Sequence, residues 1–165
     1  MIKEERMKAI VLGCGRVGAH LANSLVEHGH HVTVMDREPK AFRMLGDDLM
    51  VEHSDAVPHQ SAGPGTPRAK TVRQQIACVL GLGIDEDVLR QAGIEEADAF
   101  AAVTDSDYTN IMACLMAKEI FRVPRVIARI SEPKREKIFH QLGLETICPS
   151  ILGAQSVFEL LVKAT

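Results

Sequence analysis

The chain lacks several features that would place it at once in a common class of protein. No run of apolar residues approaches the roughly 20 that a membrane-spanning helix needs. Its 19 Lys and Arg residues nearly balance 22 Asp and Glu, and a net charge of −3 gives no electrostatic attraction for nucleic acid. The charged segment at residues 1–7 has no apolar core of the kind found in signal peptides. We therefore expect a cytoplasmic protein that has no nucleic-acid partner.

Metal-binding and catalytic patterns are also missing. The chain has four cysteines, Cys14, Cys78, Cys114 and Cys148, and no two of them form the C-x-x-C pair typical of zinc and thioredoxin-like sites. His28, His30 and His31 span the end of a predicted helix and the start of a strand, so we expect their side chains to diverge rather than bind a metal. Tyr108 is followed four residues later by Met112 rather than lysine, so a Tyr-x-x-x-Lys pair is absent. We predict that the chain is not an enzyme.

The residues that are present alternate between short apolar runs and segments of helical periodicity. Apolar runs predict strands at 8–12, 32–36, 76–80, 99–103, 125–130 and 145–148. Helices are predicted at about 16–28, 39–45, 85–92, 105–121, 131–142 and 149–165, with Ser131 as an N-cap. This alternation predicts an α/β fold, a three-layer Rossmann-type doubly wound parallel sheet with strand order 3-2-1-4-5-6.

Two segments differ from this rhythm. Residues 46–73 include a Gly- and Pro-rich run and show little periodicity, so we expect an exposed, partly disordered inserted loop. Residues 151–165 form a helix that is apolar around most of its circumference, so we expect one face to pack on the parent sheet and the rest to drive self-association. We assign residues 1–150 to a Rossmann dinucleotide-binding domain and residues 151–165 to a C-terminal oligomerisation helix.

The helix predicted at 105–121 carries an apolar stripe. Its members are Tyr108, Ile111, Met112, Leu115, Met116 and Ile120. Such a stripe is far more often core than a ligand site, so we expect it to pack against the sheet.

A glycine-rich motif lies between the first predicted strand and the first predicted helix. It reads Gly13-Cys14-Gly15-Arg16-Val17-Gly18 and fits G-x-G-x-x-G, which is informative in this strand-to-helix context. Gly13 permits a tight turn, Gly15 lets the backbone approach a pyrophosphate, and Gly18 allows the helix to pack closely on the strand. The N–H groups of the first helical turn would then bind the phosphates, and Arg16 could add a charged contact.

An acidic residue ends the second predicted strand. Asp36 occupies the region in which Rossmann domains place the carboxylate that accepts hydrogen bonds from the ribose hydroxyls. A carboxylate there repels a 2′-phosphate, so NAD(H) or an adenine nucleotide is favoured over NADP(H). The adjacent Arg37 could stack on adenine or meet a phosphate, and the plainer interpretation of Asp36 is a cap on the following helix.

With these residues in place, the sequence resembles the N-terminal RCK/KTN (TrkA-N) domain of Trk- and Ktr-type potassium-uptake regulators. The resemblance rests on residues 13–18, 29–37, 84–90, 92–99, 102–107 with Asn110, and 123–129. It covers nearly the whole chain apart from the inserted segment, and these blocks in this order are more specific than the glycine motif alone.

The resemblance implies a regulatory subunit that gates potassium transport. Such domains lie at the inner face of the membrane, form homodimers or rings beneath a potassium channel or transporter, and bind NAD(H) or, alternatively, ATP, ADP or AMP. By analogy Arg16 reaches the phosphates, Asp36 the ribose and Arg37 the adenine side of the ligand. Thr104 and Asp105 would reach its far end, Asn110 is included among the binding residues, and the last helix corresponds to a crossover helix that reaches a neighbouring subunit.

The sequence departs from the family pattern in two places. Where the family usually has Gly-Asp or Gly-Asn after the third strand, this chain has Gly81-Leu82-Gly83, and Leu82 cannot supply a polar contact near the adenine. The family also usually carries a C-terminal ligand-binding lobe, which does not follow here. We expect that the chain is a fragment or that its lobe is a separate protein.

Three classes of function compete. A dehydrogenase needs further groups that bind substrate and move protons, and the predicted strand–helix units use the whole chain. We therefore predict a NAD(H)-binding regulatory subunit that senses a nucleotide without turnover. The alternatives are a fragment of a NAD-dependent oxidoreductase, which would change NADH absorbance in the presence of a substrate, and an assembly module that binds no nucleotide.

Overall fold

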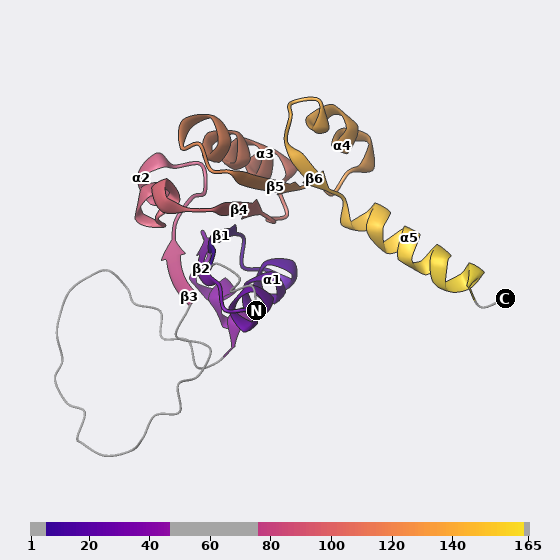
Figure 1. Cartoon of the computed structure of the whole chain (residues 1–165), viewed down its shortest axis with the longest axis horizontal. Coiled ribbons are helices and arrows are strands. Elements are labelled where there is room, and N and C mark those ends of the chain that lie inside the picture. Colours follow the sequence, from indigo (N-terminus) through magenta and orange to yellow (C-terminus); the bar gives the residue numbers. More distant parts are fainter. Residues whose placement is uncertain (1–5, 47–75, 164–165) are drawn as a thin grey trace, which may run out of the picture.

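The sheet of the computed structural model has the predicted architecture (Figure 1). The structure describes residues 6–46 and 76–163, so the predicted loop at 46–73 lies outside it apart from Gly46. Six parallel strands have the order β3-β2-β1-β4-β5-β6, which confirms the predicted fold class. The strands are β1 (Lys8–Leu12), β2 (His31–Asp36), β3 (Ile76–Leu80), β4 (Ala99–Ala102), β5 (Arg125–Arg129) and β6 (Glu145–Ile147).

Helices cover both faces of this sheet. They are α1 (Arg16–Glu27), the 3₁₀ helix η1 (Pro39–Leu45), α2 (Glu86–Gln91), the 3₁₀ turn η3 (Ile94–Glu96), α3 (Asp107–Leu115), the π-helical η4 (Met116–Ile120), α4 (Pro133–His140) and α5 (Pro149–Val162). Helix α1 and η1 pack on one face, whereas α2, α3 and η4 pack on the other (Figure 1).

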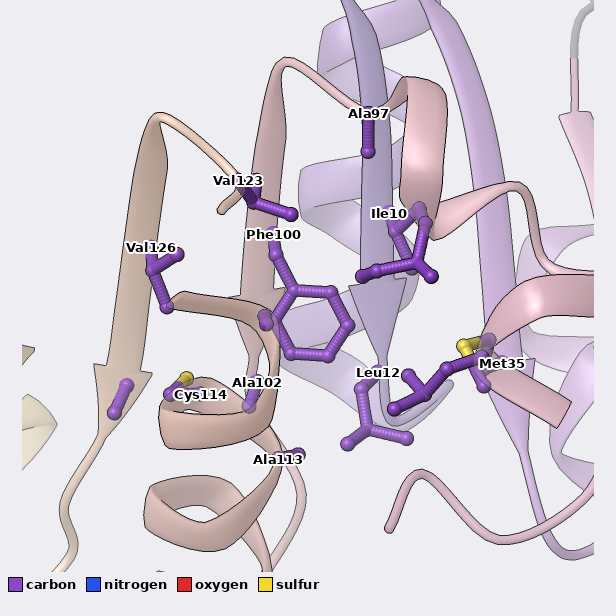
Figure 2. Packing of buried hydrophobic residues seen from close by; sticks show 14 of the residues in the cluster. Ile10, Leu12, Met35, Ala97, Phe100, Ala102, Ala113, Cys114, Val123 and Val126 are labelled. Atoms are coloured by element: carbon purple, nitrogen blue, oxygen red, sulfur yellow. The ribbon is translucent and has the colours of Figure 1, made fainter. Parts of the chain in front are cut away.

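The two cores follow from the alternation of side chains along buried strands. Ile10 and Leu12 point to the α3 side, where Phe100 lies fully buried among them (Figure 2). Val11, between them in sequence, points to the opposite face and joins the core beneath α1. Because both faces are covered, the strands read as continuous apolar runs, and this is why their positions could be predicted.

The chain reverses its direction of winding between β1 and β4. These strands are neighbours, yet the chain leaves β1 for the α1 face and β4 for the α3 face. Gly13 N donates to Met35 O at 2.7 Å and Val103 N donates to Leu12 O at 2.8 Å, so the ends of β1, β2 and β4 are tied together. Ligands of doubly wound sheets bind at such a topological switch point, outside the carboxyl ends of the strands.

The apolar stripe on the helix predicted at 105–121 was expected to pack on the sheet, and this is wrong for three of its six residues. Tyr108 is 67% exposed, Met112 53% and Ile120 51%. Small side chains take the sheet-facing positions instead, namely those of Ala113, Cys114 and Ala117. The helix also starts later than predicted, because Ser106 is its N-cap and its Oγ accepts from Thr109 N at 3.3 Å. Helical periodicity marked the largest apolar residues, whereas close approach to the sheet requires small ones.

The helix after β5 also begins differently from the prediction. Glu132 rather than Ser131 is the N-cap of α4, and its carboxylate accepts from Lys134 N at 3.4 Å, with Pro133 in the first turn. Ser131 N instead donates to Asp107 Oδ1 at 2.7 Å. The predicted N-cap was therefore one residue early, because Ser131 is held by a partner on another loop.

The last helix extends away from the sheet (Figure 1). We predicted that one face of α5 would pack on the parent sheet, and this is wrong: within the described residues, no position of α5 is buried. Leu160 and Leu161 are 73% and 74% exposed. No helix in the described part of the chain is long and apolar enough to cross a bilayer.

Candidate nucleotide-binding site

The three motif glycines differ in what surrounds them. Gly13 has a φ of +100°, and a Cβ there would lie 2.9 Å from Thr104 N. A Cβ on Gly18 would lie 1.8 Å from Gly13 O, so this glycine lets α1 pack against the turn. Around Gly15, by contrast, no described atom lies within 4 Å of the position of a Cβ. The backbone at Gly15 is therefore open to the approach of a ligand, as the motif predicts for a pyrophosphate.

The first turn of α1 borders this open space. Gly15 is the N-cap and Ala19 N is bonded to Gly15 O, so the N–H groups of residues 16–18 precede the first intrahelical bond. The first turn carries no acidic side chain, and Arg16 and Val17 are exposed. The free N–H groups and the partial positive charge of the helix terminus suit an anion.

Asp36 joins the glycine turn to the end of β2. Its Oδ2 accepts from Cys14 N at 2.7 Å and its Oδ1 accepts from Glu38 N at 2.9 Å. Asp36 O also accepts from Gly81 N at 2.9 Å, which ties the end of β3 to the same point. The plainer interpretation, a cap on the following helix, is wrong, because Glu38 is the N-cap of η1 and the bond from Glu38 N to Asp36 closes a turn before that helix. Each carboxylate oxygen keeps a free lone pair, so this fixed carboxylate can still accept from hydroxyl groups.

A cleft of about 610 Å³ lies over the carboxyl edge of the sheet. Its lining comprises Arg37 after β2, residues 105–109 after β4, and Ser131, Glu132 and Arg135 after β5. Arg37 and Asp105, which are far apart in sequence, therefore line one cleft. The residues that line it do not include the glycine turn or Asp36.

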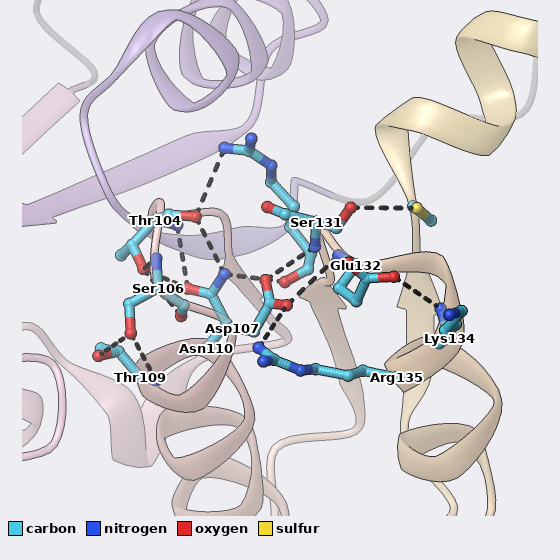
Figure 3. A network of polar contacts seen from close by, with 11 residues as sticks. Thr104, Ser106, Asp107, Thr109, Asn110, Ser131, Glu132, Lys134 and Arg135 are labelled. Atoms are coloured by element: carbon cyan, nitrogen blue, oxygen red, sulfur yellow. Dashed lines mark hydrogen bonds and ion pairs between the residues drawn. The ribbon is translucent and has the colours of Figure 1, made fainter.

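Asn110 lies behind Thr104 and is completely buried (Figure 3). Its Oδ1 accepts from Thr104 N at 3.0 Å and from Thr104 Oγ1 at 2.6 Å. Its Nδ2 donates to Thr104 O at 3.1 Å and to Arg129 O at 2.8 Å. Both ends of the amide are thus occupied by the protein, and Asn110 positions the loop at Thr104 rather than facing the cleft.

Asp107 is a central residue of the site to which we assigned no role from the sequence. Its side chain is 5% exposed, accepts from Ser131 N at 2.7 Å and Glu132 N at 3.4 Å, and forms an ion pair with Arg135 at 3.6 Å (Figure 3). The Arg135 guanidinium lies 5.1 Å from the centre of the Tyr108 ring. Asp107 thereby fixes the loop after β4 to the loop after β5. The one sequence signal was an acidic residue in the first turn of α3.

The end of β3 presents an apolar surface next to Asp36. Leu80 pairs with Asp36 in the sheet, and Leu80, Leu82 and Ile84 are each about half exposed. Leu82, where the sequence departs from the family pattern, is thus exposed two residues beyond Leu80, the sheet partner of Asp36. This surface can contact the face of a base but offers no polar side chain at position 82.

Two buried thiols, those of Cys14 and Cys114, are poor nucleophiles. Burial, followed by the negative charges of Asp36 and Cys78, raises the pKa of Cys14 to about 12, and burial raises the pKa of Cys114 to about 12. Both are therefore neutral near pH 7 and behave as small apolar side chains. Among residues 6–46 and 76–163, no group of three or more His, Cys, Asp and Glu side chains could hold a metal ion. The chemistry that the site offers is anion binding and hydrogen bonding.

Comparison with known proteins places this geometry in a family. The TrkA-N domain family matches residues 9–59 and 66–149. The Trk system potassium uptake protein TrkA of Streptomyces coelicolor is 41% identical over 141 residues, which cover 86% of this chain and 52% of the relative. A TrkA homolog of Methanothermobacter thermautotrophicus is 30% identical over 156 residues, which cover 94% of this chain and 60% of the relative. The chain thus spans little more than half the length of these relatives.

Solved structures with low sequence identity share the fold. The TrkA-N domain of the inner membrane protein ybaL from Escherichia coli has a TM-score of 0.70 at 17% identity, covering 96% of this chain and 98% of that one. The AMP-bound Kef C-terminal domain of Shewanella denitrificans has a TM-score of 0.67 at 16% identity, covering 95% and 81%. GsuK bound to ADP has a TM-score of 0.68 at 20% identity, covering 99% and 36%.

Proposed function

This chain belongs to the TrkA-N domain family, and from that premise we propose that it is the nucleotide-sensing regulatory domain of a potassium-uptake system. The observation that carries the proposal is the junction of Gly15 and Asp36. An open backbone at a helix N-terminus and a fixed carboxylate are linked through the 2.7 Å bond from Cys14 N to Asp36 Oδ2. These are the two groups that a nucleotide needs, one for its phosphates and one for its ribose.

The ligand that we propose is NAD or NADH, with ATP, ADP or AMP as the alternative. In this proposal residues 15–18 bind the phosphates and Gly13 forms the turn that places them, while Asp36 binds the ribose hydroxyls, Arg37 the adenine side, and Thr104 and Asp105 the far end. Asn110 acts through Thr104, and its four hydrogen bonds to the protein support this role. The AMP and ADP complexes of two structures with the same fold support a nucleotide as the ligand class.

We further propose that the domain assembles and acts on a membrane partner. The relatives named as potassium-uptake proteins support a potassium channel or transporter as the partner, with this domain in the cytoplasm at the inner face of the membrane. The exposed apolar residues of α5 support residues 151–165 as an oligomerisation helix that crosses to a second copy in a dimer or ring. Nucleotide exchange would change the geometry of that assembly without chemical turnover.

Calorimetric titration tests the nucleotide site. The purified chain should bind NADH, NAD⁺ or an adenine nucleotide saturably with one site per chain, and NADPH at least tenfold more weakly because Asp36 repels its 2′-phosphate. NADH absorbance should stay constant during incubation with the chain. An absence of heat with every one of these nucleotides would contradict the proposal, whereas steady NADH consumption on addition of a carbonyl substrate would favour the oxidoreductase alternative.

A further inference from the structure

Three large apolar side chains are exposed at the carboxyl end of β3 and in the loop that follows it. Leu80, Leu82 and Ile84, together called here the apolar end of β3, are each about half exposed. Leu80 pairs with Asp36 in the parallel sheet, and paired residues of neighbouring strands face the same side. The apolar end of β3 therefore starts directly beside the carboxylate that is proposed to hold the ribose.

The glycines on either side of Leu82 are packed against the rest of the domain. A Cβ on Gly81 would lie 2.6 Å from Val88 Cγ1, and a Cβ on Gly83 would collide with the Leu12 side chain. Among these three loop residues, position 82 is the one that carries a side chain, and that side chain points outward. Gly81 N donates to the last carbonyl of β2 at 2.9 Å, which fixes the loop next to the ribose site.

The acidic residue that follows this loop is engaged in capping a helix. Asp85 is the N-cap of α2, and its Oδ1 accepts from Asp87 N at 2.9 Å and from Val88 N at 3.3 Å. Asp85 N donates to Leu82 O at 3.0 Å, which closes the turn between them. From residue 80 to residue 84, no side chain carries a hydrogen-bonding group. A base that lies on this loop would therefore contact apolar side chains.

We propose that the apolar end of β3 binds the face of the nucleotide base, so that the site takes purine nucleotides as a class and does not select adenine. This inference rests on the proposed function, in which Asp36 holds the ribose that carries the base. Adenine and hypoxanthine share the shape of their ring faces and differ in the hydrogen-bonding groups at their edge. An apolar surface discriminates weakly between ligands of the same shape, whereas a hydrogen-bonding site strongly rejects a ligand that lacks the paired group. Leu82 is thus a specificity-determining residue.

Calorimetry with two matched pairs of ligands tests this assignment. The pairs are ADP with inosine diphosphate, and NADH with its hypoxanthine analogue, in which a carbonyl replaces the amino group of adenine. The wild type should bind the two members of a pair within about threefold of each other. Leu82→Asp should favour the adenine member by roughly tenfold or more, because a carboxylate accepts from the amino group and repels the carbonyl oxygen.

Leu82→Ala tests the apolar contact itself. It should weaken both members of a pair equally, by roughly three- to tenfold, because the base loses apolar contact. Leu142→Ala is the matched control, because Leu142 is 50% exposed against 54% for Leu82 and precedes β6 at the opposite edge of the sheet. It should leave every affinity unchanged. Without ligand, all three variants should unfold within about 2 °C of the wild type, since each replaces an exposed side chain.

The outcomes separate this inference from the proposed function. A wild type that prefers the adenine member of a pair by tenfold or more would overturn the inference and leave the proposed function standing. Unchanged affinities in Leu82→Ala, or an unchanged preference in Leu82→Asp, would also overturn it. If the wild type binds none of the four ligands, the proposed function itself fails and the role of Leu82 fails with it.

Discussion

The carboxyl edge of the sheet and helix α5 differ in how far their side chains find partners within the chain. At the edge, the loops after β1, β2, β4 and β5 are held by hydrogen bonds to Asp36, Asp107 and Asn110. In α5, large apolar side chains are exposed along the whole helix and none of its described residues is buried. A region that is rigid without a ligand is suited to recognition, whereas a region left apolar and exposed is suited to assembly.

The largest effect is expected from breaking the rigid region at Gly18. A methyl group there would lie 1.8 Å from Gly13 O and 2.9 Å from Gly13 C, and no side-chain rotation can move these backbone atoms away. Gly18→Ala should lower the free energy of unfolding by about 3 kcal/mol or more, measured by urea denaturation. Gly15→Ala is the matched control and should change stability by less than about 0.5 kcal/mol, because its Cβ enters open space. Equal stability of the two variants would mean that the turn is not packed as described.

A smaller effect, on binding rather than folding, is expected at Asp36. Asp36→Ala should weaken NADH binding by about 1–3 kcal/mol, because the ribose hydroxyls lose their acceptor. Asp36→Asn keeps an acceptor for Cys14 N and removes the charge, so it should narrow the difference in affinity between NADH and NADPH. Calorimetry checks both variants, and an unaltered NADH affinity in Asp36→Ala would remove this residue from the site.

Two buried thiols, one in the glycine turn and one on α3, predict a dependence of stability on pH. Burial raises the pKa of Cys14 and Cys114 to about 12, so both stay protonated in the folded chain at a pH where an unfolded thiol ionises. The stability that they contribute is present below the ordinary thiol pKa of about 8.5 and is lost as the pH rises toward 12. Between pH 8 and 9.5 the loss should be about 1 kcal/mol for each thiol.

The control for this prediction is the double variant Cys14→Ala, Cys114→Ala. Urea denaturation at the two pH values should give it a smaller loss of stability with pH than the wild type, whatever its stability at pH 8. Identical losses in the two proteins would show that the thiols are not protected from ionisation by the fold.

The smallest effect on folding, but a large one on assembly, is expected in α5. The wild type should self-associate at micromolar concentration, and Phe158→Asp combined with Leu161→Asp should run as a monomer in light scattering. Because both side chains are exposed, the free energy of unfolding of the monomer should change by less than about 0.5 kcal/mol. A wild-type chain that is monomeric under these conditions would contradict the proposed role of residues 151–165.

The difference between the carboxyl edge of the sheet and α5 also explains what could be predicted from the sequence. Buried strands are continuous apolar runs, so the strands could be located, and their order followed from the doubly wound fold class. The positions of Gly15 and Asp36 followed from local motifs. The roles of Asn110 and Asp107 did not, because their partners Arg129 and Ser131 lie 19 and 24 residues away in sequence. The stripe on α3 was assigned to the wrong face because small residues make the closest contacts with the sheet. The exposure of α5 depends on what surrounds it, which its own periodicity does not encode.

Titration of NADH into the wild type and into Gly15→Val tests the central claim most directly. Gly15 has a φ of −77° and no described atom within 4 Å of a Cβ, so valine should fit the folded chain and fill only the space proposed for the pyrophosphate. The account predicts saturable binding by the wild type, and no detectable binding by Gly15→Val with an unchanged circular dichroism spectrum and unfolding midpoint. Equal NADH affinity in the two proteins would show that the nucleotide, if bound, lies elsewhere on the chain.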